Sequence, residues 1–176
     1  MRKHTGMRPQ DIPILLKIIS YNKRKEEWQM KRLAFHLGIS QSEVSESLNR
    51  SMEAGLIDEN KKLVNRIALV EFLIHGIKYV FPQKPGAITR GVKTAHSAPP
   101  LDKKISSDMK YVWPDAHGQD LGQSIEPLYT TLVQPCRVDD YLYQFLALVD
   151  VMRVGKAREQ ELARKELEKL ILGDGK

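Results

Sequence analysis

The segment from residue 28 to residue 57 constrains the fold more than any other part of the chain, because it predicts two short helices joined by a sharp turn. Gly38 can end the first helix with the positive φ angle that other residues adopt only at a cost in free energy. Ser40, followed three residues later by Glu43, forms a capping-box pattern, so the second helix should begin at Gln41. The residues expected to pack between the two helices are small or apolar: Leu33, Ala34, Leu37, Ile39, Val44 and Leu48.

The second helix of this pair is expected to carry a polar outer face. Its outward positions would be Gln41, Ser42, Ser45, Glu46 and Asn49. Most of these side chains are of the kind that hydrogen-bonds base edges and phosphates in the major groove of DNA. We expect four of them to contact bases: Gln41, Ser42, Ser45 and Asn49. Phosphates would be held by Lys31, Arg32 and Arg50. The alternative is that the helix pair is a plain structural unit or a protein-docking module.

A short β-hairpin is expected directly after the second helix. Gly55 stops the helix, and Leu56 and Ile57 continue as a first strand. Residues 58–62 form a polar tip, and residues 63–64 return as the second strand. From this tip, Lys61 and Lys62 would reach the backbone of a bound duplex.

Residues 9–64 together resemble the winged helix-turn-helix transcriptional regulators of bacteria, such as the MarR family. The resemblance implies that residues 41–49 form the DNA-reading helix. It also implies that residues 58–62 form the tip of a wing that touches the DNA backbone.

The distribution of charge agrees with a polyanionic partner. The chain carries a formal charge of +6, and residues 1–66 hold 13 Lys and Arg against eight Asp and Glu, a net +5. The remaining 110 residues carry only +1. A basic surface of this kind gains affinity for DNA by releasing counterions, without any choice of sequence.

The composition also bears on where in the cell the protein is expected. No apolar run is long enough for a signal peptide or a membrane span, so we expect a cytoplasmic protein with no membrane partner. The single cysteine, Cys136, excludes an internal disulfide and a cysteine-based zinc site, and it is expected to be a small buried hydrophobe.

The fold class expected is α+β and mainly α, with four segments. Residues 1–64 form the winged domain, whose core is completed by a helix carrying Ile12, Leu15, Leu16 and Ile19. Residues 65–76 form a connector helix that Asn65 caps and Gly76 ends.

Residues 77–134 are expected to form a small β segment. Lys78-Tyr-Val-Phe-Pro is echoed 32 residues later by Lys110-Tyr-Val-Trp-Pro, and glycines follow each copy. This suggests two equivalent strand-and-loop units related by a pseudo-twofold axis, although two short matches can also arise by chance. The second strand of each unit would be residues 88–93 and residues 120–125.

Residues 135–176 are expected to form two C-terminal helices. Val138, Leu142, Phe145, Val149 and Met152 follow the spacing of a coiled-coil seam. Such an apolar helix must be buried by the rest of the chain, by a second copy, or by both. Asp139 or Asp140 would cap it, and Asp150 would form an internal salt bridge or, alternatively, anchor a ligand together with Arg158. A further helix over residues 157–172 pairs Glu161 with Lys165. We assign this part to dimerisation.

The sequence thus predicts a homodimeric, sequence-specific DNA-binding transcriptional regulator that represses by occupying its operator. One alternative is an antitoxin or adaptor that binds a partner protein through its middle and C-terminal parts. Another is a sensor whose ligand pocket is lined by Tyr79, Phe81, Tyr111 and Trp113. No nucleophile with a paired base, no metal-ligand spacing and no phosphate-binding loop is present, so we expect neither an enzyme nor a cofactor.

Overall fold

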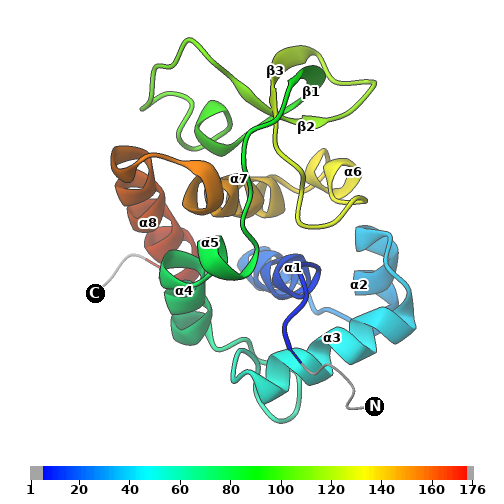
Figure 1. Ribbon diagram of the computed structural model, residues 1–176. Helices are drawn as coiled ribbons and strands as arrows, with labels where there is room; N and C mark the ends of the chain where they lie inside the picture. Colours follow the sequence, from blue (N-terminus) through cyan, green and yellow to red (C-terminus); the bar gives the residue numbers. More distant parts are fainter. Residues whose placement is uncertain (1–5, 174–176) are drawn as a thin grey trace.

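The computed structural model describes residues 6–173, and its elements are mainly helical with one small sheet (Figure 1). The α-helices are α1 (Asp11–Lys23), α2 (Met30–Leu37), α3 (Gln41–Glu53), α4 (Arg66–His75), α5 (Ile77–Val80), α6 (Val133–Cys136), α7 (Asp140–Val154) and α8 (Ala157–Leu172). The strands are β1 (Ile88–Thr94), β2 (Tyr111–Pro114) and β3 (Asp120–Ser124), and a 3-10 turn, η1 (Ala95–Ser97), follows β1. The predicted α+β, mainly α class is confirmed.

Helix α7 lies at the centre of the molecule, between the sheet and α1, with α8 along one side (Figure 1). Every residue of α7 from Phe145 to Met152 is buried. The apolar spacing that predicted a coiled-coil seam therefore belongs to a core helix, which the rest of its own chain covers. Val138, the first residue of the predicted seam, precedes the helix and is exposed.

One hydrophobic core joins the four predicted segments. It contains Leu16 of α1, Leu48 of α3, Leu73 of α4, Trp113 of β2 and Phe145 of α7. Helices α1 and α3 therefore share a core with the C-terminal helices. No helix among residues 6–173 is both long enough and apolar enough to cross a lipid bilayer.

The three strands close into a small barrel. β1 pairs antiparallel with β2 through its C-terminal half and with β3 through its N-terminal half. A short parallel contact between β2 and β3 completes the closure, pairing Tyr111 with Gln123 and Val112 with Ser124. The predicted strands at residues 88–93 and 120–125 are confirmed within one residue at each end, and they pair with each other.

The predicted internal repeat is wrong. Lys78, Tyr79 and Val80 belong to helix α5, whereas the matching Tyr111, Val112 and Trp113 form strand β2. The glycines are not equivalent either. A Cβ atom on Gly86 would meet the Ser124 side chain, whereas one on Gly118, 32 residues later, would lie 2.2 Å from the backbone carbonyl carbon of Gly91.

Two buried carboxylates, one at the start of α7 and one within it, fix this helix. Asp139 caps α7 by accepting the backbone N–H of Leu142, and it also accepts Lys17 Nζ at 2.5 Å and the Ser20 hydroxyl from α1. Asp150 accepts the Thr94 hydroxyl, the Trp113 indole N–H and Arg153. The predicted cap and the predicted internal salt bridge of Asp150 are both confirmed, and Arg158 is exposed.

The predicted helix over residues 157–172 is also confirmed, with Ala163, Leu167 and Ile171 on its buried face. On its exposed face, Glu161 lies 3.6 Å from Lys165, as expected, and 2.9 Å from Arg164.

Asp139 should make the stability of the protein depend on pH. Burial acts to raise the pKa of this carboxyl, but hydrogen bonds from Lys17, the Leu142 N–H and Ser20 outweigh it, so the pKa is lowered. The stabilisation is thus present above the unfolded-state pKa of about 3.9 and is lost as the pH falls through the lower folded-state pKa. Asp139→Asn should cost about 3–5 kcal/mol at neutral pH, because it leaves Lys17 buried without its counter-ion.

Urea unfolding of both proteins between pH 7 and about pH 2.5 checks this. The difference in unfolding free energy should stay constant down to about pH 4 and shrink below it. Asp140→Asn, at the exposed neighbouring carboxylate, is the matched control and should follow the wild type. A difference that stays constant over the whole range would contradict the assignment.

Candidate nucleic-acid interface

The turn between α2 and α3 has the geometry that its sequence predicts. Gly38 adopts a φ of 64° in the left-handed region and ends α2. Ser40 Oγ then accepts the backbone N–H of Glu43 at 3.1 Å, and α3 begins at Gln41. The Glu43 side chain does not complete the capping box. It bonds Arg50 and Gln10 instead, which ties the start of α3 to the chain before α1.

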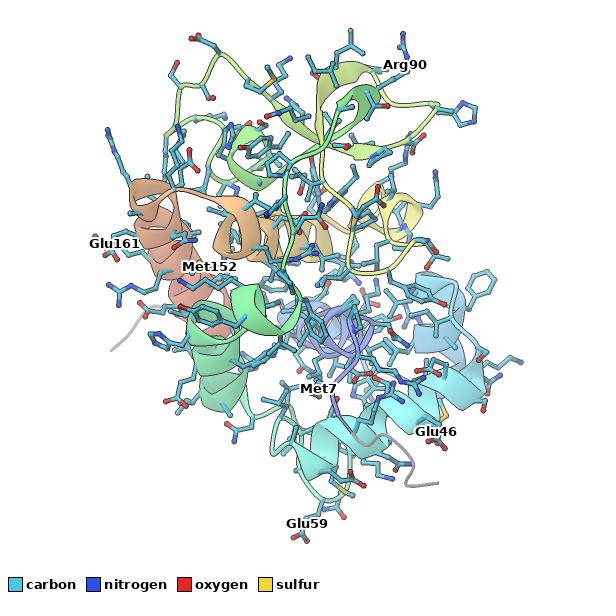
Figure 2. All side chains as sticks on the ribbon, in the orientation of Figure 1. Met7, Glu46, Glu59, Arg90, Met152 and Glu161 are labelled. Atoms are coloured by element: carbon cyan, nitrogen blue, oxygen red, sulfur yellow. The ribbon has the colours of Figure 1, made fainter. Side chains whose placement is uncertain are left out.

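Helix α3 has one buried and one open side. Val44, Ser47, Leu48 and Ser51 are buried against the core, where α3 contacts α1 and α2. Gln41, Ser42 and Glu46 are exposed, and Ser45 is half-buried. Figure 2 shows Glu46 pointing away from the body of the protein, on the side of α3 opposite the core. The polar face predicted from the sequence is thus open to solvent along its first two turns.

The predicted wing is present as a minimal hairpin. Its strands are reduced to a single antiparallel bridge between Ile57 and Val64. The tip is closed by Asp58, whose Oδ1 accepts the backbone N–H groups of Leu63 at 2.7 Å and Lys62 at 2.6 Å. These two hydrogen bonds lower the pKa of the Asp58 carboxyl. Glu59 stands at the outer end of the tip (Figure 2).

Two lysines of the wing fasten it to the helix pair. Lys61 Nζ donates a hydrogen bond to Asn49 Oδ1 of α3. Lys62 Nζ lies 5.1 Å from the centre of the Trp28 ring, just before α2. The structure therefore brings Asn49 and Lys61 together, and Lys61 occupies the Asn49 side-chain carbonyl, which is then not free for a base.

Arg50 has a different role from the phosphate contact that we expected. It is 7% exposed, and its guanidinium binds the fully buried carboxylate of Asp11 through Nε at 3.0 Å and Nη2 at 2.6 Å. It also binds Glu43 at 2.6 Å. The Asp11 hydrogen bonds are the main cause of a raised pKa for Arg50. Its side chain turns from the last turn of α3 toward α1, so Arg50 forms a structural ion pair and is not a surface cation.

The two basic residues predicted on α2 face different ways. Lys31 is exposed. Arg32 Nη2 donates to Glu26 at 2.7 Å, and the guanidinium lies 5.2 Å from the centre of the Tyr21 ring of α1. Arg32 therefore belongs to the α1 side of α2, and only Lys31 is left as an open cation on this helix among the predicted contacts.

The sequence did not predict a groove of about 590 Å³ on that α1 side. Its walls come from α1, α2 and the segment around α6, and it is lined by Lys17, Arg24, Glu26, Arg32, Phe35, His36, Gly38, Thr131, Gln134, Pro135 and Val138. The exposed Phe35, between Ala34 and His36 on α2, was the available sequence signal. The contact between α2 and the segment around α6 could not be read from the sequence, because 94 positions separate Leu37 from Thr131.

The aromatic pocket expected for a ligand sensor does not form. Tyr79 is 74% exposed, Phe81 packs edge-on against Phe72, and Trp113 is buried with Asp150. Tyr111 packs against His96. Over residues 6–173, no group of three or more His, Cys, Asp or Glu side chains is placed to hold a metal ion. Cys136 is buried as expected, and burial raises the pKa of its thiol.

Comparison with known proteins finds no matching family model, no matching curated protein and no matching solved structure. The resemblance of residues 9–64 to winged helix-turn-helix regulators therefore stays a prediction from the sequence.

Gly38 allows a direct test of the turn. Gly38→Ala should destabilise the fold by about 1–2 kcal/mol from the left-handed backbone alone. A further loss is expected because the new Cβ would lie 3.3 Å from Thr131 Cβ. Gly55→Ala is the matched control, since Gly55 has a φ of 73° but open space around it. Equilibrium unfolding in urea should show the larger loss for Gly38→Ala, and equal losses would contradict the contact with Thr131.

Arg50→Met should lower the unfolding free energy by about 3–5 kcal/mol, because it leaves Asp11 buried without a counter-ion. Arg32→Met, which removes an exposed ion pair with Glu26, should cost less than about 1 kcal/mol. Thermal or urea unfolding of the two variants measures the contrast. If Arg50→Met lowers the unfolding free energy no more than Arg32→Met does, Arg50 is a surface cation and not a buried ion-pair partner.

Proposed function

We propose that this protein is a sequence-specific DNA-binding regulator that inserts α3 into the major groove. The observation that carries the proposal is the arrangement of α2, the Gly38 turn and α3, which holds Gln41, Ser42 and Ser45 on an accessible edge while the opposite edge of α3 is buried. A helix-turn-helix reads bases with the N-terminal residues of its second helix, and these three residues occupy that part of α3.

The contact set differs from the one that the sequence predicts. Gln41, Ser42 and Ser45 would read base edges, and the amide nitrogen of Asn49 adds a donor beside Lys61. Lys31, Lys61 and Lys62 would contact phosphates. Arg32 and Arg50 are left out, because their guanidinium groups bind Glu26 and Asp11.

Glu46 should favour sequence-specific binding over non-specific binding to DNA. Its carboxylate points outward from the middle of α3, where it would repel phosphates. A carboxylate in the major groove can accept a hydrogen bond from the cytosine amino group, which offsets that repulsion only at the right base pair. We therefore expect weak non-specific binding and a marked preference for particular sites.

Two copies binding a palindromic operator form part of the proposal, since helix-turn-helix proteins commonly read two half-sites about one helical turn apart. The contact between copies has to lie on the surface of the fold. Helix α7 cannot supply it, because α7 is already covered by α1, α8 and the sheet. Repression would follow from occupation of the operator.

Selection of bound sequences from a pool of random duplexes tests DNA binding and half-site symmetry together. Gln41→Ala should then weaken binding to the selected site by about 1–3 kcal/mol while leaving random DNA unaffected. Lys62→Ala should weaken both and reduce the slope of log K against log salt by about 1. Lys84→Ala, an exposed lysine outside the helix-turn-helix, is the control and should change neither.

Fluorescence anisotropy at several salt concentrations gives these quantities. Failure of the wild type to bind any duplex at low salt would overturn the proposed function. Equal losses on selected and random DNA for Gln41→Ala would overturn the assignment of the reading face.

A further inference from the structure

The groove between α1, α2 and α6 contains an ion cluster with more positive than negative charge. Arg24 and Arg32 approach the two oxygens of Glu26, at 3.0 and 2.7 Å. Lys17 and Arg24 approach the buried carboxylate of Asp139, at 2.5 and 3.3 Å. Three cations therefore share two carboxylates, and the cluster is one negative charge short.

The unbalanced charge lies on the open side of the cluster. Lys17 and Asp139 are buried, with side chains 3% and 1% exposed, and they satisfy each other. The side chains of Arg24 and Arg32 are 29% and 46% exposed and line the groove. A guanidinium has five N–H donors in a fixed fork, which matches the two oxygens of a carboxylate.

The pKa of the neighbouring His36 is affected by the same three cations. His36 Nδ1 lies 2.7 Å from the Tyr21 hydroxyl at the edge of the groove. Burial lowers the pKa of His36, and the charges of Lys17, Arg32 and Arg24 lower it further. The groove thus disfavours an additional cation and favours an anion.

Away from the ion cluster, the groove carries exposed apolar side chains. Phe35 is 82% exposed and Val138 is 84% exposed, the two most exposed large apolar side chains of the described chain, and both line the groove together with Pro135. Exposed apolar side chains gathered at one hollow mark a binding surface rather than a solvated one. A groove of about 590 Å³ has the size of a small-molecule site.

We propose that this groove binds a small organic acid, with its carboxylate on Arg24 and Arg32 and its apolar body between Phe35, Pro135 and Val138. A single carboxylate supplies the one missing negative charge. The ligand also needs an apolar part, because only apolar contact would remove the Phe35 and Val138 side chains from water. The inference does not depend on DNA binding, since no residue that lines the groove is among the proposed DNA contacts.

Calorimetric titration of the full chain in the absence of DNA tests the site, with octanoate as the probe. Octanamide keeps the chain length but lacks the charge, and acetate keeps the charge but lacks the apolar body. Octanoate should bind at least tenfold more tightly than either. Octanoate and octanamide binding equally well, or no heat from octanoate up to roughly 10 mM, would overturn the proposal.

Variants at exposed positions locate the site without disturbing the core. Arg32→Gln should weaken octanoate at least tenfold and leave octanamide unchanged, whereas Phe35→Ser should weaken both. Lys31→Gln, at the exposed neighbour of Arg32 outside the groove, is the matched control and should bind as the wild type does. Octanoate binding that none of these changes affects would place it elsewhere and overturn the assignment.

Sedimentation velocity over a range of protein concentrations distinguishes a different occupant. The groove should remain free in the absence of acid, so Phe35→Ser should not alter the association state. Self-association that Phe35→Ser abolishes would show a second copy of the chain in the groove, and this would overturn the small-acid proposal.

Discussion

Helix α1 is held at its start and at its middle by buried ion pairs, and the rest of the structure depends on it. Near its start, Asp11 accepts Arg50 from α3. Further along the helix, Lys17 and Ser20 donate to Asp139 at the start of α7. Every residue from Asp11 to Tyr21 is buried, so α1 has no solvent-exposed face along this length. A buried charge without a partner at any of these positions would cost free energy, so each buried charged residue of α1 must keep its particular partner.

This arrangement joins the helix-turn-helix rigidly to the C-terminal half of the chain. Arg50 ties α3 to the start of α1, and Asp139 ties the start of α7 to the middle of α1. Helix α3 therefore cannot rotate relative to α7 without breaking a buried ion pair. The orientation of the exposed face of α3 is set by the whole fold rather than by a flexible linker.

Local patterns are the part of the fold that can be predicted well from the sequence. The Gly38 turn, the Ser40 cap and the bounds of α8 each depend on a few neighbouring residues, and all three agree with the structure. The repeated Lys-Tyr-Val motif led to the wrong prediction of two equivalent strands, because three residues can form part of either a helix or a strand. Residues 77–80 continue as a helix directly after α4, whereas residues 111–114 meet a partner strand in β1.

The errors at the candidate site come from contacts between distant segments. The face of α3 that carries Arg50 is polar by sequence, but its burial depends on Asp11, 39 residues earlier. The spacing of a coiled-coil seam and that of a core helix are the same, so α7 could not be told from a dimer contact until its neighbours were placed. The groove could not be predicted for the same reason, because α2 and Thr131 come together only in the folded chain.

The groove reaches the turn between α2 and α3 at the C-terminal end of α2. Thr131, just before α6, donates its hydroxyl to the Leu37 carbonyl at 2.6 Å, and its side chain packs on Gly38. Both Thr131 and Gly38 line the groove. An occupant that displaces the segment around α6 would therefore act on the residue that sets the angle between α2 and α3. Because α1 holds α3 through the buried Arg50–Asp11 ion pair, this pair opposes a change in the α2–α3 angle. Only a ligand that binds the changed arrangement much more tightly than the present one could change the angle. The contact between Thr131 and the end of α2 is therefore the physical link between the groove and the α2–α3 angle.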